Sequence, residues 1–231
     1  MYTMANHPMK PFCYDYPHPA VTTDIALFTI REERLAVLLI RRRAAPFQGC
    51  WALPGGFVEM NECLEDCALR ELAEETGVTG VYLEQLYTFG KPDRDPRERI
   101  ISVTYYALAP SEILSPVAGS DAAEVAWFAM DALPELAFDH REVIALAQQR
   151  LRAKLDYSTV AFGFMQQEFT LGELQKVYET IRGEALDKRN FRKHILALDL
   201  IGETGTSRRV GNHRPAKLYR VQHPGAVLYI K

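Results

Sequence analysis

The chain has 231 residues, which is enough for one large domain or two ordinary ones. Its composition, 48% hydrophobic and 25% charged, is that of a globular protein, and no run of about 18 apolar residues predicts a membrane span. The four cysteines lack partner histidines or a second cysteine pair at metal-site spacing. We therefore expect a reduced, cytoplasmic protein without a zinc site.

Charge is distributed unevenly along the chain. The formal net charge is −3, but Ser158–Lys231 carry 12 basic against 7 acidic residues, whereas Met1–Tyr157 carry 15 against 23. A basic C-terminal part behind an acidic body indicates two tasks and predicts an anionic partner for the basic part. We expect an irregular arm, an N-terminal domain and a C-terminal domain, at residues 1–17, 18–155 and 156–231.

Two strands are predicted first. Val21–Ile30 and Leu35–Arg41 are rich in β-branched and apolar residues and flank a short charged connection. Arg42 and Arg43 follow the second strand directly. The run Arg41–Arg43 is either a charged strand end or a phosphate contact, with Arg43 as the candidate residue, because arginine is the usual residue for phosphate.

The segment Gly56–Val78 has the densest pattern of chemistry-bearing residues. Glu71, Glu74 and Glu75 fall within one narrow arc of a helix. Gly77 is expected to end this helix in a left-handed conformation. The sequence therefore predicts three carboxylates on one side of the last helical turns.

Such carboxylates are unfavourable at this position, because a helix carries partial negative charge at its C-terminus and like charges repel. Arg70 offsets only one of them. A divalent cation would remove the conflict, since Mg²⁺ and Mn²⁺ bind a few carboxylates together with substrate phosphates. A solvated acidic helix face is the alternative interpretation.

The neighbouring residues favour the metal site. Leu53–Gly56 predict a tight turn where backbone can approach a ligand, and from Gly56 the spacing reads G-x5-E-x7-R-E-L-x-E-E-x-G-V. This pattern resembles the Nudix box of hydrolases that cleave nucleoside diphosphates linked to another group. The resemblance implies a site for Mg²⁺ or Mn²⁺ formed by Gly56, Glu71, Glu74 and Glu75. It implies that Arg70 orients a glutamate, so that Arg70 and the three glutamates are the catalytic residues.

Two further strands, Val81–Phe89 and Ile100–Ala109, flank a polar, arginine-rich loop that cannot be core. The candidate contacts for a pyrophosphate or its ribose are Arg94, Arg97 and Arg99; a solvated hairpin is the alternative. A short strand at Val125–Phe128 and a helix within Pro134–Tyr157 follow. Together these elements predict a mixed sheet between helices, which is the α/β/α sandwich of the Nudix family, over residues 18 to 150.

The C-terminal part has the order of a winged helix-turn-helix. Thr170 and Glu173 form a capping box before one helix, Gly183 ends it, and Asp187 caps a second helix, Lys188–Leu198. A polar hairpin and a last strand, Ala216–Val221, follow. The fold class is therefore α+β, a sandwich followed by a winged helix.

In a winged helix the second helix enters the DNA major groove and the hairpin reaches the backbone. The candidate DNA contacts on the helix are Lys188, Arg189, Asn190, Arg192 and Lys193, and those on the hairpin are Arg208, Arg209 and Arg214. Basic residues supply affinity through phosphates, while Asn190 suits a base edge. Contact with another protein is the alternative.

Almost the whole chain is similar to the Nudix-related transcriptional regulators of NAD metabolism, through Phe169–Glu179, Leu186–Lys193 and Arg214–Arg220 in addition to the box. The resemblance implies a homodimer on palindromic double-stranded operator DNA, which ADP-ribose or a related nucleotide releases by binding the Nudix domain. Sugar-utilisation regulators share this architecture. Many members have lost the box glutamates, whereas this chain retains them.

Two hypotheses result: an ADP-ribose-sensing repressor in which hydrolysis survives, or chiefly an ADP-ribose pyrophosphatase whose C-terminal part serves assembly. The catalytic base stays open between a box glutamate and Glu98.

Overall fold

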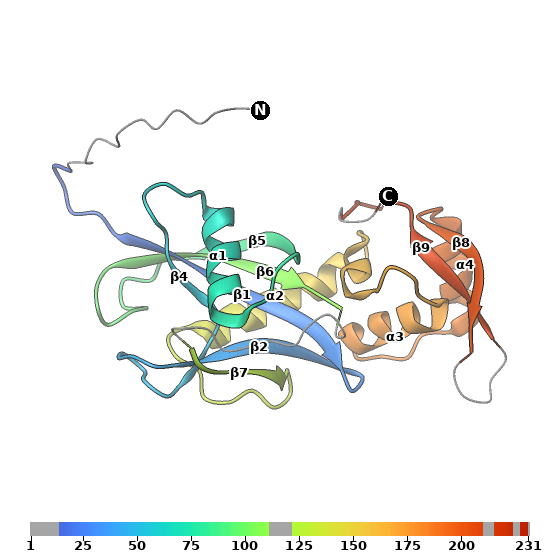
Figure 1. The fold of residues 1–231 in the computed structure, drawn as a ribbon, viewed down its shortest axis with the longest axis horizontal. Coiled ribbons are helices and arrows are strands. Elements are labelled where there is room, and N and C mark those ends of the chain that lie inside the picture. The colour runs from blue at the N-terminus through green and yellow to red at the C-terminus, as the bar shows by residue number, and fades with distance from the viewer. Residues whose placement is uncertain (1–13, 111–121, 210–214, 224–226, 231) are drawn as a thin grey trace.

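The computed structural model describes residues 14–110, 122–209, 215–223 and 227–230, and Figure 1 shows its fold. Most of the arm predicted for residues 1–17 lies outside these residues, and so does Arg214. No helix within the described ranges is long and apolar enough to cross a membrane.

The N-terminal part is built on a mixed sheet. Its strands within the described residues are β1 (Ala20–Arg31), β2 (Arg34–Arg42), β3 (Trp51–Ala52), β4 (Gly55–Phe57), β5 (Tyr82–Phe89), β6 (Ile100–Leu108) and β7 (Ala122–Ala129). The order is β3-β2-β1-β6-β5, with β4 paired to β1 and β7 paired to β2. Only the β1–β6 pair is parallel among these. The predicted strands are confirmed.

Two helices cover the faces of the sheet (Figure 1), namely α1 (Leu64–Thr76) and α2 (His140–Lys154). Successive strand residues point to opposite faces. Ile25 of β1 accordingly packs with Leu72 of α1, whereas Phe28 belongs to the cluster that contains Ile144 of α2. The expected sandwich is therefore confirmed, and its central strand is buried on both faces.

The second helix begins at His140 and not at Pro134, so the predicted helical range was too long at its start. The amide of Ala137 donates a hydrogen bond of 2.8 Å to the carbonyl of Trp51. Phe138 has a φ of 52°, which no α-helical residue adopts. Pairing with β3 thus holds this segment outside the helix.

The C-terminal part is a winged helix, as predicted. Its elements are a short 3₁₀ helix (Val160–Phe164), α3 (Leu171–Arg182), α4 (Lys188–Ala197), β8 (Ile201–Arg208) and β9 (Ala216–Val221). The capping box of Thr170 and Glu173 is present before α3, and the Asp187 side chain caps α4. β8 and β9 pair antiparallel and form the predicted hairpin.

α3 packs directly against the sandwich (Figure 1). At the turn between β1 and β2, Glu33 forms an ion pair with Lys176, and its carbonyl accepts a hydrogen bond of 3.3 Å from the Thr180 hydroxyl. At the other end, Arg152 of α2 donates to the carbonyl of Ile181 at 2.9 Å. The hydrophobic core continues through this junction, since one cluster contains residues of both parts.

Candidate functional site

The site begins where the turn before β4 meets the last turns of α1. The amide of Gly55 donates a hydrogen bond of 2.8 Å to Glu75, and a Cβ on Gly55 would lie 2.1 Å from the carbonyl oxygen of Thr23. A Cβ on Gly56 would lie 2.3 Å from the Glu71 carboxylate. The absence of a side chain therefore lets Gly55 lie against the backbone of β1 and lets Gly56 approach the Glu71 carboxylate.

Arg70 is the centre of the charged network on α1. It binds Glu62 through two hydrogen bonds, of 2.9 and 2.7 Å, and it contacts Glu71 at 2.8 Å and Glu74 at 3.2 Å. The hydrogen bonds from Arg70 lower the pKa of Glu62 to about 2. Arg70 thus holds three carboxylates in fixed positions, including the Glu62 of the box.

The Glu71 carboxylate is in a different environment from that of Glu62. Burial raises the pKa of Glu71 above the ordinary value despite the contact with Arg70. Its side chain is 15% exposed. A carboxylate that is short of solvation beside a cavity favours a cation as neighbour. Desolvation is the main cause of this raised pKa, and repulsion from Glu74 and Glu62 adds to it.

A cavity of about 600 Å³ opens in front of these residues. Glu71, Glu75 and Gly56 line it, whereas Glu74 does not and its side chain is 57% exposed. Within the described residues no three His, Cys, Asp or Glu side chains are grouped closely enough to hold a metal ion. Mg²⁺ is usually bound by one or two carboxylates, several waters and substrate phosphates, so the oxygen donors along the cavity fit such an ion.

The predicted arginine contacts divide into two groups. Arg43, Arg94 and Arg97 line the cavity, whereas Arg99 does not and its guanidinium donates to the carbonyl of Lys91 at 3.2 Å. Arg97 is held by Asp95. The structure therefore brings three of the four candidates together at the cavity.

Arg94 is buried, and its side chain is only 3% exposed. It binds Asp139 through two hydrogen bonds and lies 3.6 Å from Asp24. With its charge already paired, Arg94 is placed to fix the wall of the cavity, in addition to any contact with a ligand. No local pattern indicates these two partners, which lie 45 and 70 residues away along the chain.

Asp24 and His140 also line the cavity, as does Arg42 of the predicted arginine run, and the first two were not expected there from the sequence. His140 Nδ1 accepts the amide proton of Leu53 at 2.9 Å, and Nε2 lies 3.5 Å from Asp24. Burial lowers the pKa of His140, so the ring is neutral and presents Nε2–H to Asp24. The only available signal was Asp24, the single charged residue within the predicted strand Val21–Ile30.

The second candidate site is the surface of α4. Its predicted DNA contacts are all exposed, namely Lys188, Arg189, Asn190, Arg192 and Lys193, and Arg209 after β8 is exposed as well. Phe191 and Ile195 are buried on the opposite side of α4. The helix therefore presents a positively charged face while its apolar face packs inward.

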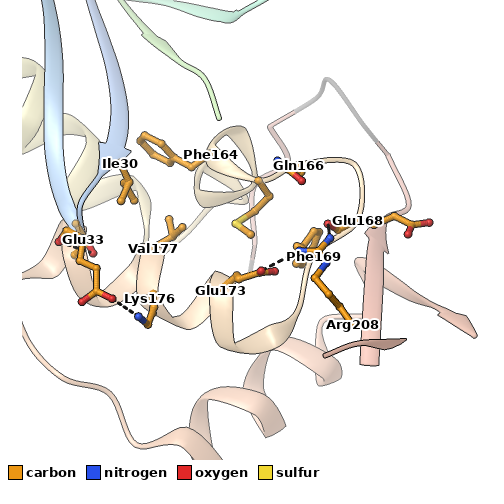
Figure 2. A pocket seen from close by; sticks show the side chains of 12 residues that line it. Ile30, Glu33, Phe164, Gln166, Glu168, Phe169, Glu173, Lys176, Val177 and Arg208 are labelled. Carbon is orange, nitrogen blue, oxygen red and sulfur yellow. Dashed lines mark hydrogen bonds and ion pairs between the residues drawn. The ribbon is translucent and has the colours of Figure 1, made fainter. Parts of the chain in front are cut away.

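Arg208 lies elsewhere. It forms an ion pair of 3.0 Å with Glu173 and donates to the carbonyl of Glu168 at 3.1 Å. Figure 2 shows these residues beside a cavity of about 200 Å³ that extends to Glu33 and Lys176 at the junction of the two parts. Arg208 thus joins β8 to the start of α3, and its guanidinium is engaged inside the domain.

Comparison with known proteins gives matches along both parts. The Nudix domain model matches residues 19–147, and the NrtR DNA-binding winged helix domain model matches residues 161–221. The chain is 39% identical over 209 residues to the ADPR responsive transcriptional repressor NtrR of Acinetobacter baylyi, covering 89% of this chain and 83% of that protein. It is 43% identical over 129 residues to the ADP-ribose pyrophosphatase of Methanocaldococcus jannaschii, covering 56% and 73%.

The structure is similar to that of Shewanella oneidensis NrtR in complex with a 27mer DNA. The TM-score is 0.79 at 38% identity, and the match covers 87% of this chain and 93% of that one. The Nudix domain of the same NrtR, solved with ADP ribose, matches with a TM-score of 0.55 at 37% identity, covering 60% and 94%. Both parts of the chain therefore have the arrangement found in one DNA-binding relative.

Proposed function

The chain belongs to the Nudix family and carries an NrtR DNA-binding winged helix domain, and from this we propose that it is an ADP-ribose-responsive transcriptional repressor of NAD-metabolism genes. The observation that carries the proposal is the combination of two surfaces on one continuous core. A cavity with carboxylates and arginines lies in the sandwich, and a positively charged helix lies on the winged helix packed against it.

For the DNA side, we propose that a homodimer places two copies of α4 in successive major grooves of a palindromic operator. The DNA phosphates are contacted by Lys188, Arg189, Arg192 and Lys193, and a base edge is contacted by Asn190. The exposure of all five side chains supports this assignment. Arg209 is the candidate contact from the wing, and Arg214 remains a second one.

For the ligand side, the proposed effector is ADP-ribose or a closely related nucleotide in the 600 Å³ cavity. Arg43 and Arg97 carry charge suited to its pyrophosphate. The proposed ion is Mg²⁺ or Mn²⁺, held by Glu71 and Glu75 with Gly56, and by Glu74 if its exposed side chain turns inward. When bound, such an ion neutralises charge on phosphoryl oxygens and lowers the pKa of a bound water.

We also propose that hydrolysis of the effector is retained. Glu71 and Glu75 line the cavity, Arg70 holds Glu71 in place, and Gly55 holds Glu75. The identity to an ADP-ribose pyrophosphatase over 129 residues supports this second activity. A repressor that slowly removes its own inducer combines both hypotheses.

A mobility-shift experiment tests the proposal. The full chain is titrated onto its own upstream DNA at moderate salt, with and without ADP-ribose. We expect a shifted protein–DNA complex that dissociates when ADP-ribose is added. AMP plus ribose 5-phosphate at equal concentration is expected to leave the complex intact. Absence of any shift, or a shift that ADP-ribose leaves unchanged, contradicts the regulatory function.

A further inference from the structure

The turn Leu53–Gly56, which joins β3 to β4, is held by contacts with β1, α1 and α2. A backbone hydrogen bond of 2.9 Å joins it to β1, and the Gly55 amide donates to Glu75 of α1 at 2.8 Å. The contact with α2 is different in kind. There the amide of Leu53 donates a hydrogen bond of 2.9 Å to a side chain, the Nδ1 atom of His140.

The Leu53 amide depends on this acceptor. Leu53 is only 2% exposed, and it falls between the end of β3 at Ala52 and the start of β4 at Gly55. A buried backbone N–H costs free energy when it is left unpaired, and here its partner is a side chain instead of a neighbouring strand. The position of the turn therefore depends on the position of one imidazole ring.

The imidazole ring of His140 is itself fixed from its other side. Nε2 lies 3.5 Å from Asp24 of β1. Asp24 in turn accepts the hydroxyl of Ser102 and lies 3.6 Å from the Arg94 guanidinium. Because Nδ1 accepts the Leu53 amide, the ring proton is on Nε2 and faces this carboxylate. The ring cannot rotate without losing both contacts.

The contact with Leu53 requires a neutral ring. Burial lowers the pKa of His140 and thereby favours the neutral form. The charged groups that face the ring, from β1, β2, the loop before β6 and α2, are Asp24, Arg42, Arg94 and Asp139. A protonated imidazole donates at both nitrogens, so it would leave the Leu53 amide without an acceptor.

We propose that His140 is a positioning residue for the ion site, which holds the turn so that Gly55 reaches Glu75 and Gly56 lies against Glu71. Packing alone does not require an imidazole here, since an apolar side chain would fill the space without the cost of burying a polar ring. Groups around a reacting phosphate must be placed closely, and a misplacement of about 1 Å costs about 100-fold in rate. The inference rests on the proposed hydrolysis, but the contact itself is measurable without turnover.

Three substitutions separate the possible roles of the ring. In His140→Asn the amide oxygen is attached to Cγ, as Nδ1 is, so it keeps an acceptor for Leu53 and loses the contact with Asp24. His140→Gln reaches toward Asp24 and loses that acceptor. His140→Leu fills the space without any polar atom. If the ring served packing only, His140→Leu would be the mildest change; the positioning role predicts that His140→Asn is the mildest.

The first measurement is hydrogen–deuterium exchange of the segment 51–57 by mass spectrometry, without ligand or metal. We expect this segment to exchange roughly 5- to 150-fold faster in His140→Leu and His140→Gln, as for loss of one buried hydrogen bond, whereas His140→Asn stays near wild type. The control is His194→Asn, the same substitution at an exposed position of α4. Circular dichroism establishes that each variant is folded, and the Asn and Gln variants suffice if His140→Leu does not fold.

The second measurement is AMP release from ADP-ribose with Mg²⁺ across pH 5 to 8. We expect kcat to fall about 100-fold in His140→Leu and His140→Gln and to stay near wild type in His140→Asn. Wild type is expected to lose activity in an additional step below the ordinary histidine pKa of about 6.5, as the ring takes up a proton. His140→Asn lacks this step, whereas protonation of the box glutamates affects both proteins alike.

The inference is overturned if His140→Leu exchanges and turns over like wild type while His140→Asn does not, because that order indicates packing. It is also overturned if His140→Gln alone keeps wild-type behaviour, because that result assigns the role to the contact with Asp24. An acid step of equal size in His140→Asn and wild type contradicts it as well. Wild-type protein that releases no AMP contradicts the proposed hydrolysis, and the order of exchange rates then decides the role of His140 by itself.

Discussion

Arg94 of the loop between β5 and β6 binds both carboxylate oxygens of Asp139 at the start of α2, through hydrogen bonds of 3.0 and 2.7 Å. The other end of α2 reaches the winged helix, where Arg152 donates to the carbonyl of Ile181 at 2.9 Å. The helix therefore connects the wall of the cavity to α3. We therefore expect a ligand that moves the arginine-rich loop to affect α3 through α2.

The Arg94–Asp139 pair is predicted to be important for stability. The side chains are 3% and 9% exposed, and removal of one partner from a buried ion pair costs about 3–5 kcal/mol. We expect Arg94→Met to lower the free energy of unfolding by about this amount in urea denaturation. The matched control is Lys91→Met, whose pair with Glu142 is exposed and worth at most about 1 kcal/mol. Equal losses in the two variants would show that Arg94 is no more than a surface charge.

Hydrolysis is predicted to depend on the glutamates that line the cavity. Glu75→Gln removes a carboxylate that receives the Gly55 amide and belongs to the proposed ion site. We expect AMP release from ADP-ribose to fall at least about 100-fold in Glu75→Gln, because electrostatic groups at phosphoryl centres have effects of this size. Glu65→Gln, an exposed residue in the first turn of α1, is the control. Turnover that is unaffected by Glu75→Gln would exclude the box as the catalytic centre.

The Glu62–Arg70 pair predicts a specific dependence of stability on acid. The pKa of Glu62 falls from 4.5 to about 2 because Arg70 donates to its ionised form. Because the pKa of Glu62 is lower in the folded than in the unfolded state, the ionised side chain stabilises the folded protein at pH values above about 4.5. This stabilisation is lost as the pH falls from about 4.5 to about 2. Ionisation of Glu71 has the opposite effect on stability, since its raised pKa shows that the fold favours the protonated form.

We therefore expect Glu62→Gln to be less stable than wild type at pH 6 and to approach it in stability near pH 2, in thermal melts across this range. Glu59→Gln is the control, because Glu59 contributes only its backbone to this network. A stability difference between wild type and Glu62→Gln that stays constant from pH 6 to pH 2 would refute the ionic role of Glu62.

The DNA surface predicts different outcomes for two arginines of the winged helix. Arg192 is exposed on α4, so Arg192→Ala is expected to weaken operator binding uniformly across sequences and to reduce the salt slope by about 1. Arg208 instead forms an ion pair with Glu173 and donates a hydrogen bond to the backbone carbonyl of Glu168. Arg208→Ala is expected to leave the salt slope unchanged. Fluorescence anisotropy over a range of salt concentrations measures the salt slope of each variant. An equal reduction of the slope in Arg192→Ala and Arg208→Ala would show that Arg208 also contacts the DNA.

Local signals were sufficient for much of the fold. Gly77 ends α1 with a φ of 71°, and the Thr170 and Glu173 capping box starts α3, because these patterns act within one helical turn. The start of α2 was not predictable in this way. Residues 134–139 are held outside the helix by Trp51, which is more than 80 residues earlier in the chain.

The same limit applies to the site. The box residues could be identified from spacing alone, since they lie on one helix and one turn. The pairs Arg94–Asp139 and His140–Leu53 join residues 45 and 87 positions apart, so only the folded chain reveals them. Arg208 was predicted as a DNA contact from its charge, and only the folded chain reveals that β8 brings it to Glu173.

The central claim is that the cavity and α4 are linked, and binding measured in both directions tests it most directly. The affinity of the full chain for operator DNA is measured with and without saturating ADP-ribose, and the affinity for ADP-ribose is measured with and without saturating operator. Linkage requires the two ratios to be equal, and we expect each ligand to weaken the other by the same factor, about 5- to 150-fold. Independent binding, with both ratios equal to one, would contradict the account.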